Sequence, residues 1–208
     1  MKQLFLITAI LLLTIINMNA QHIPEKEAKP YTEAFEKKIG IPVPYQFVWA
    51  KRVTADDKKA VLVRYQKDGK EALKGEHFSF VITENNFKIL GFTHMDRKYA
   101  ATQLLSKTET ERIAKDFLKK TDASLADKLE NQWIERHDEE ITVGGKKMVL
   151  AGMKYKCYDA AADDYAWVII GADGSVVTFE RDIKWNNAAQ KRITEKWLHD
   201  QWLDDNKL

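Results

Sequence analysis

The chain has 208 residues, of which 33 are basic and 31 acidic, and its formal net charge is +2. Because both signs are mixed along the chain, the charge gives no reason to expect nucleic acid or an anionic membrane as a partner. The sequence contains one cysteine, Cys157, which excludes an intrachain disulfide.

The first twenty residues read as a cleavable signal peptide. Lys2 supplies a positive start, the run 4–16 is apolar apart from two threonines, and Ala20 offers a small residue before the cut. The run is too short to cross ~30 Å of hydrocarbon as a helix. We therefore expect cleavage after Ala20 and a secreted or periplasmic product without stable membrane insertion. An uncleaved N-terminal anchor is the alternative.

The next part of the chain, residues 30–103, is expected to form one helix and four strands behind a polar leader at 21–29. Pro30 opens the predicted helix, and Gly40 supplies a left-handed stop. Polar turns separate runs of strand-forming residues after this helix. The four strands are predicted at 45–53, 60–66, 77–82 and 87–93.

A second helix and four more strands are expected over residues 104–184. Ser106 and Glu109 have the spacing of a capping box, which predicts that a helix begins at this point. Apolar residues recur at helical spacing over 113–118. Strands are then predicted at 132–142, 147–158, 165–170 and 175–182, and the segment 185–208 is expected to hold an amphipathic helix from Asn187 to Asp204.

This order of elements predicts an α+β fold built from two units, each a four-stranded antiparallel sheet with a helix across one face. A gapless shift of 87 residues superposes Phe80–Phe92 on Trp167–Phe179. Each segment reads as a strand, a polar turn and a strand ending in phenylalanine. This likeness favours an internal repeat. The alternative is that any two hairpins look alike.

The second half resembles a known family. The helix at 108–118 and the hairpin at 165–179 are similar to the PepSY-type domain, in which strands after a helix end in an aromatic-rich hairpin around a glycine. The resemblance covers about residues 104–184, with a degenerate copy at about 30–96. It implies a small α+β module of exported or envelope proteins. Better-understood members lie in propeptides of secreted metalloproteases, which they inhibit or chaperone, and the family has no catalytic residues to carry over. Unlike those propeptides, this chain contains no protease domain.

The densest group of metal-ligating residue types is the run 137–140, His-Asp-Glu-Glu. It lacks the spacing of a helical zinc motif or a calcium loop. On a strand, His137 and Glu139 share one face, so a weak two-ligand site is one interpretation. The favoured one is a charged edge that resists aggregation. Nucleophile elbows and phosphate-binding glycine loops are absent. We therefore predict no enzyme activity, no cofactor and no metal.

Several residues have a structural interpretation and a functional one. Cys157 alternates with Lys154 and Lys156, which favours a buried structural thiol over a reactive one. Trp167 and Phe179 are expected to lie together on the buried face beneath the second helix. Three tryptophans in or beside the last helix are candidate partner-binding residues if they are exposed, because indoles dominate interface hot spots. These are Trp185, Trp197 and Trp202.

Two functions remain as hypotheses. The leading one is a non-enzymatic binding module of PepSY-like type that acts on another exported or envelope protein, for example by modulating or inhibiting a protease. The alternative is a carrier of a small apolar ligand, a lipid or a cofactor, in the cell envelope.

Overall fold

The structure is a computed structural model, which describes residues 20–68, 73–100 and 103–208. The predicted signal peptide lies outside the described residues, apart from Ala20. In these three ranges, no helix is long and apolar enough to cross a membrane.

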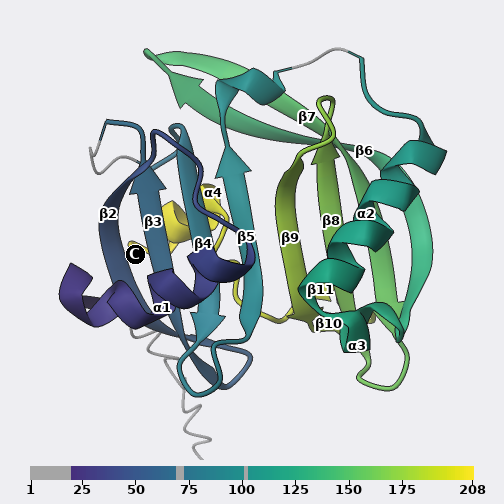
Figure 1. The fold of residues 1–208 in the computed structure, drawn as a ribbon, viewed down its shortest axis with the longest axis horizontal. Coiled ribbons are helices and arrows are strands. Elements are labelled where there is room, and N and C mark those ends of the chain that lie inside the picture. Colours follow the sequence, from purple (N-terminus) through teal and green to yellow (C-terminus); the bar gives the residue numbers. More distant parts are fainter. Residues whose placement is uncertain (1–19, 69–72, 101–102) are drawn as a thin grey trace, which may run out of the picture.

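The described residues form an α+β fold around a nine-stranded antiparallel sheet (Figure 1). The strand order is β1-β2-β3-β4-β5-β9-β8-β7-β6. The N-terminal half contains β1 (Gln21–Ile23), α1 (Glu25–Lys38), β2 (Gln46–Ala55), β3 (Lys58–Gln66), β4 (His77–Thr83) and β5 (Ile89–Met95), followed by the short helix η1 (Arg97–Tyr99). The C-terminal half contains α2 (Lys107–Thr121), α3 (Ala123–Ala126), β6 (Leu129–Val143), β7 (Lys146–Asp159), β8 (Asp164–Gly171) and β9 (Val176–Ile183).

All eight predicted strands are present, at bounds within a few residues of those expected. The predicted cap is also confirmed, because the Ser106 hydroxyl accepts the backbone N–H of Glu109 at 3.2 Å. Helix α1 begins earlier than expected, so Pro30 lies inside it. The predicted leader instead contributes β1 and the first turn of α1, which carries two glutamates where the helix dipole favours acids. Gly40 has a φ of +94°, as a left-handed helix stop requires.

The prediction of two separate sheets is wrong, because β5 pairs with β9 and joins the halves into one sheet. An unpaired edge strand in each half would leave a row of backbone donors and acceptors without partners, and pairing the two edges satisfies both rows. Phe92 lies opposite Phe179 at this junction, and the 87-residue shift equates the same two residues. Gly91 permits the close approach, since a Cβ there would lie 2.5 Å from the carbonyl oxygen of Phe179.

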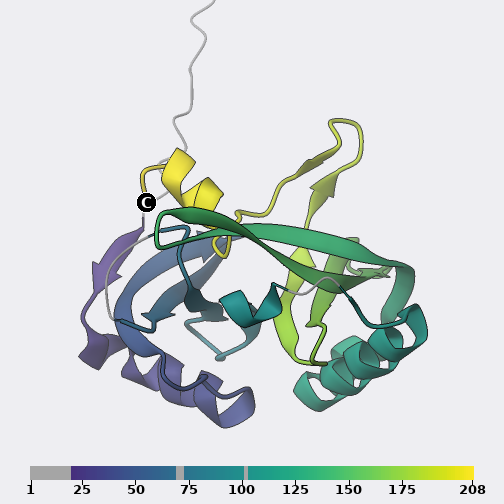
Figure 2. The same ribbon diagram turned by 90° about the horizontal axis from the view of Figure 1, so that it is seen from above.

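Helices α1 and α2 lie side by side on one face of the sheet, here called the front (Figures 1 and 2). One apolar cluster beneath them runs through both halves. Phe35 of α1 stacks on Phe80 with ring centroids 4.0 Å apart. Phe117 of α2 meets Phe179 edge-on at 5.3 Å. The front core is therefore continuous across the β5–β9 junction.

The opposite face, the back, carries two separate apolar clusters. In the N-terminal half, Trp197, Leu198 and Leu203 pack on β2, β3 and β4. They belong to residues 185–208, here called the C-terminal segment. In the C-terminal half, the cover is the outer part of the β6–β7 hairpin, residues 138–151, here called the arm. Figure 2 shows the arm and the C-terminal segment on the side of the sheet away from α1 and α2.

Trp167 and Phe179 are both buried, but the prediction that they share a face is wrong. Phe179 belongs to the front cluster, whereas Trp167 belongs to the back cluster under the arm. Residue 168, not 167, lies opposite Phe179 in the register. Because both faces of the sheet are covered, apolar residues occupy consecutive positions and the alternation pattern does not identify the face.

The predicted C-terminal helix is largely replaced by a hairpin and a turn. Strands β10 (Trp185–Asn186) and β11 (Lys191–Arg192) form a two-stranded sheet, and α4 covers only Asp200–Asp205. The Asn186 side chain accepts the backbone N–H of Ala189 at 2.9 Å, and Gln190 has a φ of +47°. Asn closes such turns readily, which competes with a helix at this point.

The arm bends over the back of the sheet at Gly152, where a Cβ would lie 2.6 Å from a side-chain carbon of Ile169. Ile141 and Leu150 anchor the arm in the back cluster of the C-terminal half. At the tip, the Thr142 N–H donates to the carbonyl oxygen of Lys74 at 2.6 Å. The arm therefore starts in one half and docks on the other.

Candidate binding site

A group of half-exposed side chains gathers on the back of the C-terminal half, around the ammonium of Lys156. Three aromatic ring centroids lie 4.4–5.6 Å from this ammonium. These distances fall within the range of cation–π attraction. We call this group the aromatic–lysine surface, and it consists of Trp133, Lys154, Lys156, Tyr165 and Trp185.

Both lysines of this surface are poorly solvated. The Lys154 ammonium lies 3.9 Å from the ring centroid of Trp167, and burial lowers the pKa of Lys154 to about 8. Burial also lowers the pKa of Lys156. Neither ammonium has a carboxylate oxygen within ion-pair distance among the described residues, although the charges of Glu180 and Glu139 act on Lys154 from further away and favour its ammonium form. An external carboxylate would therefore meet two cations that have no direct ion pair.

The three candidate tryptophans have different environments. Trp185 in β10 belongs to the aromatic–lysine surface, with its ring centroid 5.6 Å from the Lys156 ammonium. Trp197 is buried, and its indole N–H donates to the carbonyl oxygen of Thr54 at 2.8 Å. Trp202 packs edge-on against Trp197 at 4.9 Å. The structure thus separates Trp185 from the other two, which cover the N-terminal half.

The sequence analysis missed most of this surface. Trp133 lies on β6, both lysines on β7 and Tyr165 on β8, and the register brings Trp133 opposite Lys156. The sequence signal for this surface was the alternation of Lys154 and Lys156 with buried residues, which indicates that both lysines face away from the front core. Which aromatic rings they met depended on pairing across strands.

A polar seam separates the two apolar clusters of the back face. It contains two buried ion pairs contributed by the C-terminal segment. Glu180 of β9 accepts from Arg192 at 2.7 Å and lies 3.1 Å from His199 Nε2. Arg64 of β3 donates twice to Asp200, at 2.6 and 2.9 Å. These pairs tie β11 and the start of α4 to the sheet.

Neutral polar groups fill the middle of the seam. The hydroxyls of Thr93 and Thr178 lie 2.9 Å apart across the β5–β9 junction. His77 of β4 is buried, with Nδ1 at 2.9 Å from the carbonyl oxygen of Gly75, and burial lowers the pKa of His77 to about 4. His77 is therefore neutral at pH 7.

A pocket of about 310 Å³ opens where the seam meets the arm. Its walls come from β4, β5, β9, the arm and the start of α4, which lie far apart in the sequence. His199 of the pocket lining and Arg192 both contact Glu180. Arg192 also lies 5.5 Å from the ring centroid of Trp167, the ring over which Lys154 of the aromatic–lysine surface lies. The two features therefore share one side of the molecule.

The residues singled out for metal or thiol chemistry are also placed. His137 and Glu139 do share a face, with Nε2 and Oε1 2.9 Å apart. Over the described ranges, no group of three or more potential ligands gathers around one point. Cys157 is buried in the front core, and burial raises the pKa of its thiol to about 11. The prediction of a buried thiol is confirmed.

The neutral histidines make stability depend on pH. Burial lowers the pKa values of His77 and His94 to about 4, below the ordinary value of ~6.5 expected in the unfolded chain. Between these values the unfolded chain binds more protons, so stability falls as pH drops from 6.5 to 4. Each histidine contributes roughly 3 kcal/mol at most. Urea unfolding at pH 7 and pH 4.5 should show this loss.

A variant assigns the effect to one side chain. His77→Gln removes the titrating ring, so we expect a smaller difference between the two pH values than in the wild type. His22→Gln, at an exposed position, should leave the difference unchanged. An equal loss of stability in His77→Gln and the wild type would contradict the assignment.

Comparisons with known proteins found no match. No family model matches the sequence, and neither a curated protein nor a solved structure shows significant similarity.

Proposed function

We propose that this chain is an exported, non-enzymatic binding module whose partner is another exported or envelope protein, held at the aromatic–lysine surface. The observation that carries the proposal is the pair of poorly solvated lysines, 154 and 156, set among half-exposed rings with no carboxylate at ion-pair distance within the described residues. Aromatic side chains supply most of the binding energy in protein interfaces, and complementary charge gives specificity. The partner therefore presents a carboxylate beside an apolar or aromatic group.

The setting of the surface supports a recognition role. Its residues stand on paired strands, so their positions are fixed before a partner arrives and little conformational entropy is lost on binding. The PepSY-like resemblance agrees with a role on exported proteins, and it makes an exported protease the first partner to test. The export itself rests on the signal-peptide prediction.

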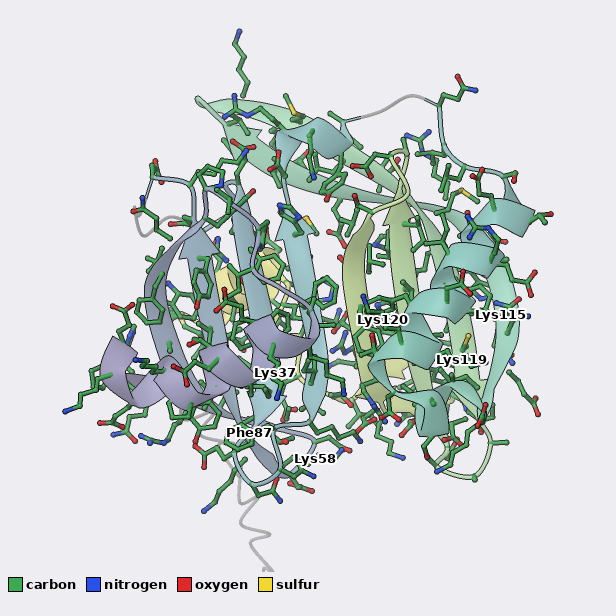
Figure 3. The ribbon with its side chains drawn as sticks, viewed as in Figure 1. Lys37, Lys58, Phe87, Lys115, Lys119 and Lys120 are labelled. Carbon is green, nitrogen blue, oxygen red and sulfur yellow. The ribbon has the colours of Figure 1, made fainter. Side chains whose placement is uncertain are left out.

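Site-specific photo-crosslinking tests the proposal. A photoreactive phenylalanine analogue at Trp185 is expected to capture an exported protein, whereas the same analogue at Lys115 is not. Lys115 is exposed on α2, on the opposite, front side of the sheet (Figure 3). Adding Lys156→Glu should abolish the Trp185 crosslink, because it places an acid where the partner's carboxylate binds.

Thermal melts of both labelled proteins provide the control for folding. A crosslink of the same protein from both positions, or one that survives Lys156→Glu, would show that the surface does not bind the partner.

The alternative, a carrier of a small apolar ligand, has less support. An apolar pocket between β5, β9 and the C-terminal segment holds about 20 Å³. One water molecule needs about 10–15 Å³ of cavity, so this pocket is too small for a lipid or a cofactor. The larger pocket is lined by charged and hydroxyl side chains as well as apolar ones.

A further inference from the structure

The pocket beneath the arm has the dimensions of a small-molecule site. At about 310 Å³ it lies at the lower end of the range for ligand pockets, ~300–1,000 Å³. The arm forms its roof, and the hydrogen bond from Thr142 to the carbonyl oxygen of Lys74 closes one end. The floor is the polar seam at the β5–β9 junction, with Thr93 and Thr178.

Glu139 is the charged group that this pocket leaves without a strong cation. Its side chain is 33% exposed, and its one ion-pair partner among the described residues is His137, at 2.9 Å. Burial opposes the charge, but the hydrogen bond with His137 and the nearby His199 hold the pKa of Glu139 below its usual value. Glu139 is therefore ionised at pH 7. In the part of the chain that the structure describes, no lysine or arginine lies within ion-pair distance of Glu139, although its charge acts on Lys154 from further away.

The other charges of the lining are already paired. Asp200 accepts from Arg64 and from the backbone N–H of Lys74. On the roof, the Lys147 ammonium lies 2.7 Å from Glu140. An anionic ligand would have to displace one of these partners, and it would also face Glu139. A cationic ligand would pair with Glu139 without displacing a direct lysine or arginine partner.

The remaining lining suits the rest of such a ligand. Met95, Ile141 and Leu198 provide apolar surface beside the acid. The hydroxyls of Thr93 and Thr178 lie 2.9 Å apart, and each oxygen keeps a lone pair that can accept an ammonium N–H. The pocket thus combines one available negative charge, hydroxyl acceptors and a short apolar wall.

We propose that this pocket binds a small primary amine in its ammonium form, with the ammonium on Glu139 and a short apolar chain against Met95, Ile141 and Leu198. This site is separate from the protein-binding role of the aromatic–lysine surface, and either one stands if the other fails.

Three ligands of the same size test the charge requirement. n-Butylamine, 1-butanol and butyrate differ in charge and share the alkyl chain. In two-dimensional NMR titrations at pH 7, n-butylamine is expected to shift resonances of Thr93, Thr178 and Ile141 and to saturate. 1-Butanol should bind more weakly, because it has no charge to pair with Glu139. Butyrate should leave the resonances of these three pocket residues unshifted.

Two matched variants assign the contact. Glu139→Gln keeps the shape of the side chain and should weaken n-butylamine binding about tenfold, the value of one charge-assisted hydrogen bond. Glu135→Gln, on the same strand but outside the pocket lining, should bind as the wild type does. Thermal melts show that both variants are folded.

The proposal is overturned if Glu139→Gln binds n-butylamine unchanged or if 1-butanol binds equally well. It is also overturned if no pocket resonance moves, since the cavity then holds only water.

Discussion

Replacing Phe179 by alanine is expected to lower the free energy of unfolding by about 3–5 kcal/mol, the cost of a large cavity in a packed core. Phe179 has no exposed surface and lies at the β5–β9 junction. Its ring meets Phe117 at 5.3 Å and Phe92 at 6.4 Å, so it touches α2 and both halves of the sheet. The loss is a large share of the ~5–15 kcal/mol that holds a typical domain together.

Urea unfolding followed by tryptophan fluorescence measures this loss, and Phe87→Ala is the matched control. Phe87 is 44% exposed at the β4–β5 turn and should cost far less (Figure 3). If both substitutions destabilise the protein equally, the junction is not the packed centre of the molecule. If Phe179→Ala unfolds in two steps, the halves hold together mainly through this residue.

Replacing Glu180 by glutamine is expected to cost about 3–5 kcal/mol, because removing one member of a buried ion pair leaves the other charge uncompensated. Glu180 and Arg192 have side chains only 4% and 5% exposed. The arginine also donates to the carbonyl oxygens of Thr194 and Glu195, so it cannot turn away to water without breaking those bonds.

The same unfolding measurement with two further variants identifies the cause. Glu130→Gln, an exposed glutamate on β6, should change stability by less than about 0.5 kcal/mol. The double variant Glu180→Leu with Arg192→Met removes both charges and should recover most of the loss. A double variant as unstable as Glu180→Gln would show that shape, and not the unpaired charge, sets the cost.

The strands could be predicted from the sequence because their signals are local. Turn residues such as those after Gln66 and before His77, and the Ser106 cap, act within a few positions of the chain. The elements at the two chain ends were predicted less well. Asn187 and the residues after it carry a helical pattern, but the Asn186 turn and the buried Arg192–Glu180 pair favour a hairpin there.

The joining of the halves could not be read from local patterns. Pairing of β5 with β9 depends on two edges more than eighty residues apart and on the room left at Gly91. The arm and the C-terminal segment cover the back face of the sheet through contacts that are equally non-local. Because of this cover, both faces of the sheet are apolar. That is why Trp167 was assigned to the wrong face. The internal repeat remains a prediction.

Only one residue of the candidate site, Trp185, was among those predicted. Its neighbours Lys154 and Lys156 looked like ordinary solvent-facing lysines of a strand, because the sequence shows alternation but not which rings lie opposite. The pocket could not be predicted from the sequence for the same reason, since β4, β5, β9, the arm and α4 each contribute to it.

The chain end that covers the N-terminal half sets the order in which the protein can mature. Trp197 and Leu203 pack over Trp49 and Leu62, so the first half to leave the ribosome lacks its back cover until the last residues have emerged. Until residues 197–203 are available, the apolar back face of β2 and β3 stays open to water, so this half cannot complete its packing. A protease that cuts near Lys196 would therefore loosen the N-terminal half, because Trp197 donates to Thr54 and Asp200 accepts from Arg64 there.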